Sequence, residues 1–122
     1  MKIPADSDSE LAPYLNSAEL ILQTAEQIKK DFEFFNLEIK FSGNAEKAYE
    51  ELFTQIEPHI SKYIHSDYQK LLSLLYRIDV SEKRISEAVN ESENVSEEIT
   101  RLVIFRELQK VVIRKYYNSL NE

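Results

Sequence analysis

The scarcity of glycine constrains this chain more than any other feature of its sequence. Its 122 residues include one glycine, Gly43, and three prolines, Pro4, Pro13 and Pro58. Because β-sandwiches use glycine at turns and close approaches, so low a glycine content favours helices. Phosphate-cradling loops of the P-loop and dinucleotide-binding types need more than one glycine, and the sequence therefore excludes them.

Composition narrows the class of protein further. Hydrophobic residues make up 43% of the chain and charged residues 30%, which is typical of one globular domain. Cysteine is absent, which removes disulfides, thiolate metal sites and cysteine nucleophiles. Residues 1–10 are small, polar and acidic, and we expect them to form a flexible tail before a single helical domain over residues 11–122. Because no apolar run marks a leader or a membrane span, we expect a cytoplasmic protein without a membrane partner.

Apolar residues recur at helical spacing in the first half of the domain. The first such segment covers roughly residues 17–35 and predicts a helix that ends at Asn36, a residue that tolerates left-handed backbone. A second segment starts after Asn44 and keeps one apolar face through Pro58. We therefore predict a single kinked helix of about twenty residues there rather than two helices.

Three polar pairs with the spacing of capping boxes mark further helix starts. They are Ser66 with Gln69, Asp79 with Glu82, and Asn94 with Glu97. The first two pairs predict short helices, and the third predicts a long last helix that reaches about Leu120. Since this last helix is apolar on most of its sides, we expect it to be buried centrally. The sequence predicts an all-α bundle of four or five helices around the long C-terminal helix.

A short alternating segment near residues 37–41 interrupts the helical pattern. Leu37, Ile39 and Phe41 alternate with Glu38 and Lys40, which is the period of a half-buried strand. No second strand is evident, and a lone strand is unstable. The segment therefore either lies extended across helices as an ordered connection or pairs with the same segment of a second chain in a homodimer.

The last helix carries one polar constellation, in which Arg106, Lys110 and Arg114 follow one another at spacings of four. In a helix that is apolar on several sides, such a stripe approaches buried surface, where cations need partners. In the structural interpretation the stripe pairs with carboxylates at the preceding helix junction, such as Asp79 or Glu82, and fixes the docking of the helix. In the functional interpretation Arg106 and Arg114 contact a phosphate, a carboxylate or a partner protein.

Residues that could bind metals or catalyse reactions are not grouped in the sequence. His59 and His65 are six positions apart and point in different directions from a straight helix. No glutamate precedes a histidine at the spacing of di-metal bundles, and serines concentrate at caps and loops. We therefore expect no metal, no cofactor and no catalytic residue, which argues against an enzyme.

Two stretches resemble a family of short, uncharacterised bacterial helical proteins. They run from Leu74 to Glu82 (LLYRIDVSE) and from Arg106 to Lys110 (RELQK), and the segment from Lys30 to Glu33 adds to the likeness. The resemblance covers about the last two thirds of the chain. It implies a small helical fold with no assigned activity, and it transfers no catalytic residue.

These observations favour a non-enzymatic protein that acts through protein–protein contact. Phe32, Phe34, Phe35 and Phe41 lie within ten residues, and an exposed Phe34 would add to an apolar patch of the kind that interfaces use. The partner would be an unidentified protein or a second copy of the chain. Nucleic acid is a poor candidate because the net charge is -7 and phosphate contact relies on clustered cations.

The alternative is a small ligand- or anion-binding protein or an enzyme. Its pocket would lie between helices near Arg106, Lys110 and Tyr76. An apolar cavity with convergent polar groups would support this alternative, whereas a filled core with both cations in ion pairs would support the interaction protein.

Overall fold

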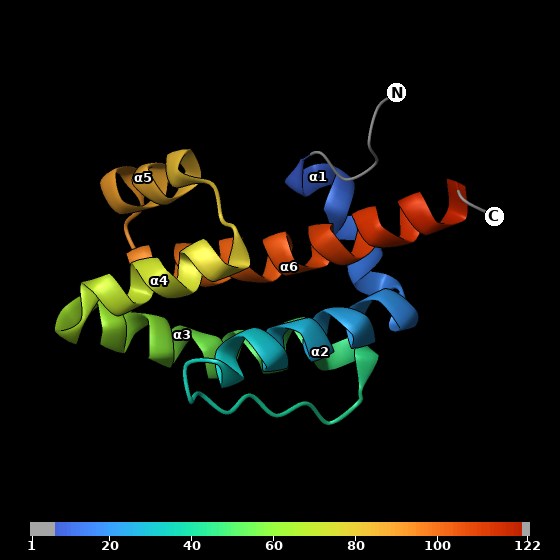
Figure 1. Ribbon diagram of the computed structural model, residues 1–122, viewed down its shortest axis with the longest axis horizontal. Helices are drawn as coiled ribbons and strands as arrows, with labels where there is room; N and C mark the ends of the chain where they lie inside the picture. Colours follow the sequence, from blue (N-terminus) through green and yellow to red (C-terminus); the bar gives the residue numbers. More distant parts are fainter. Residues whose placement is uncertain (1–6, 121–122) are drawn as a thin grey trace.

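The computed structural model describes residues 7–120 as helices packed around one long helix. The elements in chain order are α1 (Asp8–Leu11), the 3-10 turn η1 (Ala12–Asn16), α2 (Ala18–Glu33), the 3-10 turn η2 (Ala45–Lys47), α3 (Ala48–Ser66), α4 (Tyr68–Ile78), α5 (Glu82–Glu91) and α6 (Val95–Leu120). Helix α6 runs through the molecule, with α2 and α3 on one side and α1 and α5 on the other (Figure 1). The predicted all-α bundle around the C-terminal helix is confirmed.

Helix α6 is central because its apolar side chains point in several directions. Leu102, Val103, Ile104 and Phe105 are consecutive, and all four are buried. Only a helix with neighbours on most sides buries four successive residues. One core cluster joins α6 to α2, α3 and α4, and a second cluster joins it to α1 and the start of α2.

The start of the domain differs from the flexible tail expected over residues 1–10. Part of that stretch forms α1, which packs on α6. Asp8 accepts hydrogen bonds from Arg84 at 2.8 Å and from Arg101 at 2.6 Å. The composition of residues 1–10 could not predict that part of this stretch is helical, because Arg84 and Arg101, which bind Asp8, are distant in the sequence. The remainder of the expected tail, residues 1–6, lies outside the described residues.

Two helices end on residues with left-handed backbone. Asn36 follows α2 with φ of 61°, and Asp79 follows α4 with φ of 70°. In each case the next backbone N–H binds the carbonyl five residues earlier at 3.0 Å, which makes both ends Schellman motifs. The prediction for Asn36 is confirmed. The prediction that Asp79 caps α5 is wrong, because Asp79 closes α4 and Ser81 stands before α5.

Two other helix starts show how local the capping signal is. Asn94 caps α6 as predicted, and its Oδ1 accepts the N–H of Glu97 at 3.1 Å. The predicted pair of Ser66 and Gln69 is wrong by one residue, because Asp67 caps α4 and Ser66 ends α3. The side chain of Ser66 turns back along α3 instead, and its Oγ donates to a backbone carbonyl one turn earlier at 2.7 Å.

Helix α3 passes through Pro58 without ending, as predicted. Ile56 and Ile60, on either side of the proline, are fully buried. Core packing on both halves therefore offsets the backbone hydrogen bond that proline cannot donate. The side chain of Asn44 caps the 3-10 turn that leads into this helix.

The alternating segment after α2 forms no strand and lies extended. Ile39 is buried, whereas Lys40 is exposed. The side-chain amide of Gln55 on α3 accepts the Lys40 N–H at 2.8 Å and donates to the Lys40 carbonyl. Glu51, one turn earlier, accepts from the N–H and the hydroxyl of Ser42 at 2.6 and 2.8 Å. Side chains of α3 thus take the place of a partner strand, which favours the ordered connection over pairing in a homodimer.

Candidate functional site

Arg106 joins α6 to the end of α4. Its Nη2 donates to Oδ2 of Asp79 at 2.8 Å, and its Nε donates to the Asp79 backbone carbonyl at 2.9 Å. Its Nη1 donates to Oε1 of Gln109 at 2.7 Å. The Asp79 side chain is 79% exposed, so water screens this ion pair. The structure therefore brings Arg106 and Asp79 together in a docking contact between helices.

Lys110 belongs to a second polar group, which we call the carboxyl cluster. Its members are Asp31 of α2, Arg77 of α4, and Glu107 and Lys110 of α6. Nε of Arg77 lies 3.1 Å from Oδ1 of Asp31, and Nζ of Lys110 lies 3.7 Å from Oδ2. Lys110 also contacts the Glu107 carboxyl group, and Gln27 donates to Asp31 at 3.3 Å. The cluster ties three helices together.

Glu107 and Asp31 are adjacent carboxyl groups, which we call the carboxyl pair. The side chain of Glu107 is fully buried. Burial raises its pKa, the adjacent Asp31 raises it further, and Lys110 compensates only in part, so the pKa reaches about 8. Burial also raises the pKa of Asp31, but the hydrogen bond with Glu107 and the charge of Lys110 outweigh that effect and hold this pKa below its usual value. These two shifts favour a protonated Glu107 beside an ionised Asp31 at neutral pH.

Of the other predicted site residues, Arg114 reaches the carboxyl cluster only through Gln27, and Tyr76 and Glu82 lie apart from both groups. Arg114 is exposed, and its Nη2 donates to Oε1 of Gln27 at 3.5 Å. Tyr76 and Glu82 face a groove on α4 that neither Arg106 nor Lys110 lines. Arg106 lines a different hollow. The structure thus does not bring the members of the predicted pocket together.

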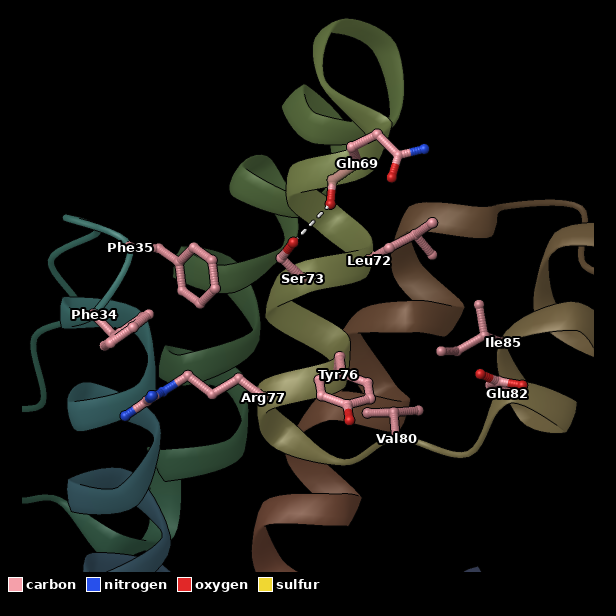
Figure 2. Close-up of a pocket in the computed structure, with 10 residues that line it drawn as sticks. All are labelled: Phe34, Phe35, Gln69, Leu72, Ser73, Tyr76, Arg77, Val80, Glu82 and Ile85. Carbon is pink, nitrogen blue, oxygen red and sulfur yellow. Dashed lines mark hydrogen bonds between the residues drawn. The ribbon is translucent and has the colours of Figure 1, made fainter.

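A groove along α4 has a volume of about 680 Å³, and we call it the α4 groove. It is lined by Phe34, Phe35, Gln69, Leu72, Ser73, Tyr76, Arg77, Val80, Glu82 and Ile85. Figure 2 shows α4 between the end of α2 and the start of α5, with side chains from all three helices around it. The opposite face of α4 is buried in the core. The groove therefore leaves one long face of α4 without a partner in the fold.

Exposed aromatic side chains stand at this groove. Tyr76 is 86% exposed and Phe34 is 66% exposed. The guanidinium of Arg77 lies 4.0 Å from the centroid of the Phe34 ring, and Phe35 packs edge-on against that ring. Because Asp31 anchors the same guanidinium, the carboxyl cluster positions one wall of the groove.

A second hollow of about 270 Å³ lies at the junction of α4 and α5. Two guanidinium groups, from Arg84 and Arg106, line it. Each is already bonded to a carboxylate at 2.8 Å, Arg84 to Asp8 and Arg106 to Asp79. An anion that entered this hollow would compete with carboxylates that are already in place, which disfavours an anion site.

The histidines do not form a metal site. His59 and His65 lie on α3, and Nδ1 of His65 lies 2.8 Å from the carbonyl oxygen of Ser61. Burial, with a smaller effect of Lys62, lowers the pKa of His59. Among residues 7–120, no three His, Cys, Asp or Glu side chains gather so as to hold a metal ion. None of the described helices is long and apolar enough to cross a membrane.

Sequence reasoning missed the carboxyl pair, although one signal for Glu107 was present. Val103, Glu107 and Val111 follow at spacings of four on the same side of α6, and all three are buried. A charged residue in the middle of an apolar stripe indicates a paired or protonated group. No local signal pairs it with Asp31 on a distant helix.

Comparison with known proteins adds no further constraint, since no family model, curated protein or solved structure matches the chain. The resemblance to short bacterial helical proteins stays a prediction. Any assignment of function therefore depends on the geometry of the two polar groups and the α4 groove.

Proposed function

We propose that this protein is not an enzyme and acts through protein–protein contact at the α4 groove. The observation that carries the proposal is the exposure of Phe34 and Tyr76 at the edge of an apolar hollow. Large aromatic side chains are usually buried, and they are enriched where proteins contact each other. A groove that spans three helices offers a continuous surface of this kind.

The rigidity of the groove supports the same function. Its floor is a helix whose other face is held in the core, and one wall is held by Arg77 and the carboxyl cluster. A surface that is ordered before binding loses less conformational entropy when a partner arrives. The carboxyl pair has a structural role here, because neither Asp31 nor Glu107 lines the groove or the second hollow.

The rival proposal, a ligand pocket near Arg106, Lys110 and Tyr76, lacks such an observation. Tyr76 lines the α4 groove and Arg106 lines the second hollow, while Lys110 lines neither. Self-association and a cytoplasmic location remain predictions.

Site-specific photocrosslinking tests the proposal. A photoreactive phenylalanine analogue replaces Tyr76 in one version of the protein and Tyr117 in another, and each version is irradiated in the cells from which the chain derives. Tyr117 is a matched control because it is also exposed but lies on α6, outside the groove. We expect discrete adducts from position 76 that weaken with the added substitution Phe34→Ser. Identical adducts from both positions, or none from position 76, would overturn the proposal.

A further inference from the structure

The shape of the α4 groove fits a helix better than an extended segment. Gln69, Leu72, Ser73 and Tyr76 line it at spacings of three and four along one face of α4, and Val80 lines it just beyond the end of the helix. The seven residue steps from Gln69 to Tyr76 correspond to about 10 Å, or roughly two helical turns. A second helix laid along such a face packs its side chains between these ridges.

An extended peptide lacks the template that it would need. Peptides that bind as strands add to the edge of a sheet, where unpaired backbone groups receive them. Residues 7–120 contain no strand. The extended segment near Lys40 does not provide an edge at that residue, because the Gln55 side chain already occupies its backbone N–H and carbonyl.

Of the described residues that line the groove, the one charged residue without a partner is anionic, which favours a cationic occupant. Two charged residues line it, Arg77 and Glu82. Arg77 is engaged by Asp31 and by the ring of Phe34. No side chain among residues 7–120 forms an ion pair or hydrogen bond with Glu82, so its carboxylate is available to a ligand. The chain as a whole carries a net charge of -7, which attracts a basic partner at long range.

We propose that the α4 groove binds a basic amphipathic helix from another protein. This inference rests on the proposed function and adds the chemistry of the partner. The apolar face of the incoming helix packs against Phe34, Tyr76 and Ile85, while a lysine or arginine on its flank pairs with Glu82. A second copy of this acidic chain fits less well, because like net charges repel.

Two synthetic peptides test this chemistry. Both have about 18 residues and leucine along one face, but one carries lysine and the other glutamate on the opposite face. Each peptide is titrated into the full chain, with affinity read from fluorescence anisotropy and the contact surface mapped by backbone chemical shifts. We expect the lysine peptide to bind with shifts along α4, at Phe34 and at the start of α5, and the glutamate peptide to bind at least tenfold more weakly.

Four substitutions separate the groove contact from general attraction between opposite charges. Tyr76→Ser should weaken the lysine peptide about tenfold, and Glu82→Gln about threefold with a smaller salt dependence. Tyr117→Ser removes an exposed aromatic outside the groove, and Glu87→Gln removes a carboxylate of α5 that does not line it. Both of these controls should leave affinity unchanged.

Each other outcome rejects a distinct part of the proposal. If the glutamate peptide binds the groove as tightly, or if Glu82→Gln changes no more than Glu87→Gln, the basic partner is wrong although the groove contact stands. If neither peptide shifts groove resonances, the helical occupant is wrong, and crosslinking at position 76 then decides the proposed function by itself. If the free chain sediments as a dimer that Tyr76→Ser dissociates, the occupant is a second copy.

Discussion

Replacement of Glu107 by glutamine tests the carboxyl pair most sharply. Glutamine has almost the same shape as a protonated glutamate, and its amide can still donate a hydrogen bond to Asp31. Unlike glutamate, glutamine does not ionise between pH 5 and pH 8. If Glu107 is protonated in the folded protein at neutral pH, Glu107→Gln preserves the packing and removes the cost of ionising a buried group.

The raised pKa fixes the direction of the pH effect. Glu107 binds its proton with a pKa of about 8 when folded and 4.5 when unfolded, so the folded state holds more protons between these values. Its contribution to stability is fully present below pH 4.5 and is lost as pH rises toward 8. Each pH unit well inside this window changes the free energy of unfolding by about 1.4 kcal/mol, and because the slope falls near each pKa the total from pH 5 to pH 8 is about 3 to 4 kcal/mol.

Urea unfolding from pH 5 to pH 8, followed by far-ultraviolet circular dichroism, measures this difference. Glu107→Gln should match the parent protein within about 1 kcal/mol at pH 5 and exceed it by about 3 kcal/mol at pH 8. Glu87→Gln, on the exposed face of α5, should show no such trend. Comparison of variant with parent cancels other titrations, including that of His59. A difference that does not change with pH, or a variant that is less stable at pH 8, would refute the protonation of Glu107 in the folded protein.

Substitutions at three other positions test the contacts that join the helices. Arg106→Met should lower the free energy of unfolding by only about 1 kcal/mol, because its partner Asp79 is solvated; a loss above about 3 kcal/mol in chemical denaturation would show that the pair behaves as buried. Asp79→Ala should cost about 1–2 kcal/mol and Asp79→Gly less, because glycine adopts positive φ without strain, and the reverse order would contradict the left-handed helix end. Gln55→Ala should speed hydrogen exchange at the Lys40 amide while leaving buried amides of α6 protected, and unchanged exchange at Lys40 would rule out the side-chain pairing.

Local signals in the sequence predict most of the fold. The hydrogen bonds at Asn36 and Asn94 join groups within five residues of each other in the sequence. The end of α2 and the start of α6 can therefore be predicted from local sequence. The same locality explains the errors. Ser66 and Asp67 are adjacent residues that can both cap a helix, and hydrophobic periodicity does not choose between them. Asp79 looks like a cap for the helix that follows, but its positive φ, which closes the preceding helix, has no local sequence signature as strong as glycine.

The candidate site was harder to predict because it depends on contacts between distant segments. The run of phenylalanines predicts an interaction patch only if Phe34 is exposed and is equally compatible with a place in the core, while Tyr76 is one of the predicted site residues. Neither indicated a groove, because the groove exists only where the end of α2 and the start of α5 flank α4. The proton on Glu107 likewise follows from burial beside Asp31, which is a property of the folded chain alone.

The central claim is that the protein acts through the α4 groove, and the size of the protein in its own lysate tests that claim most directly. Fluorescently labelled parent chain and the double variant Phe34→Ser, Tyr76→Ser are compared by sedimentation in lysate from the source cells. Both substituted residues are largely exposed, so the variant should fold like the parent, which circular dichroism checks. The parent should sediment in a complex heavier than its 14.3 kDa monomer, and the variant should sediment as the monomer. A folded variant that sediments with the parent would contradict the account.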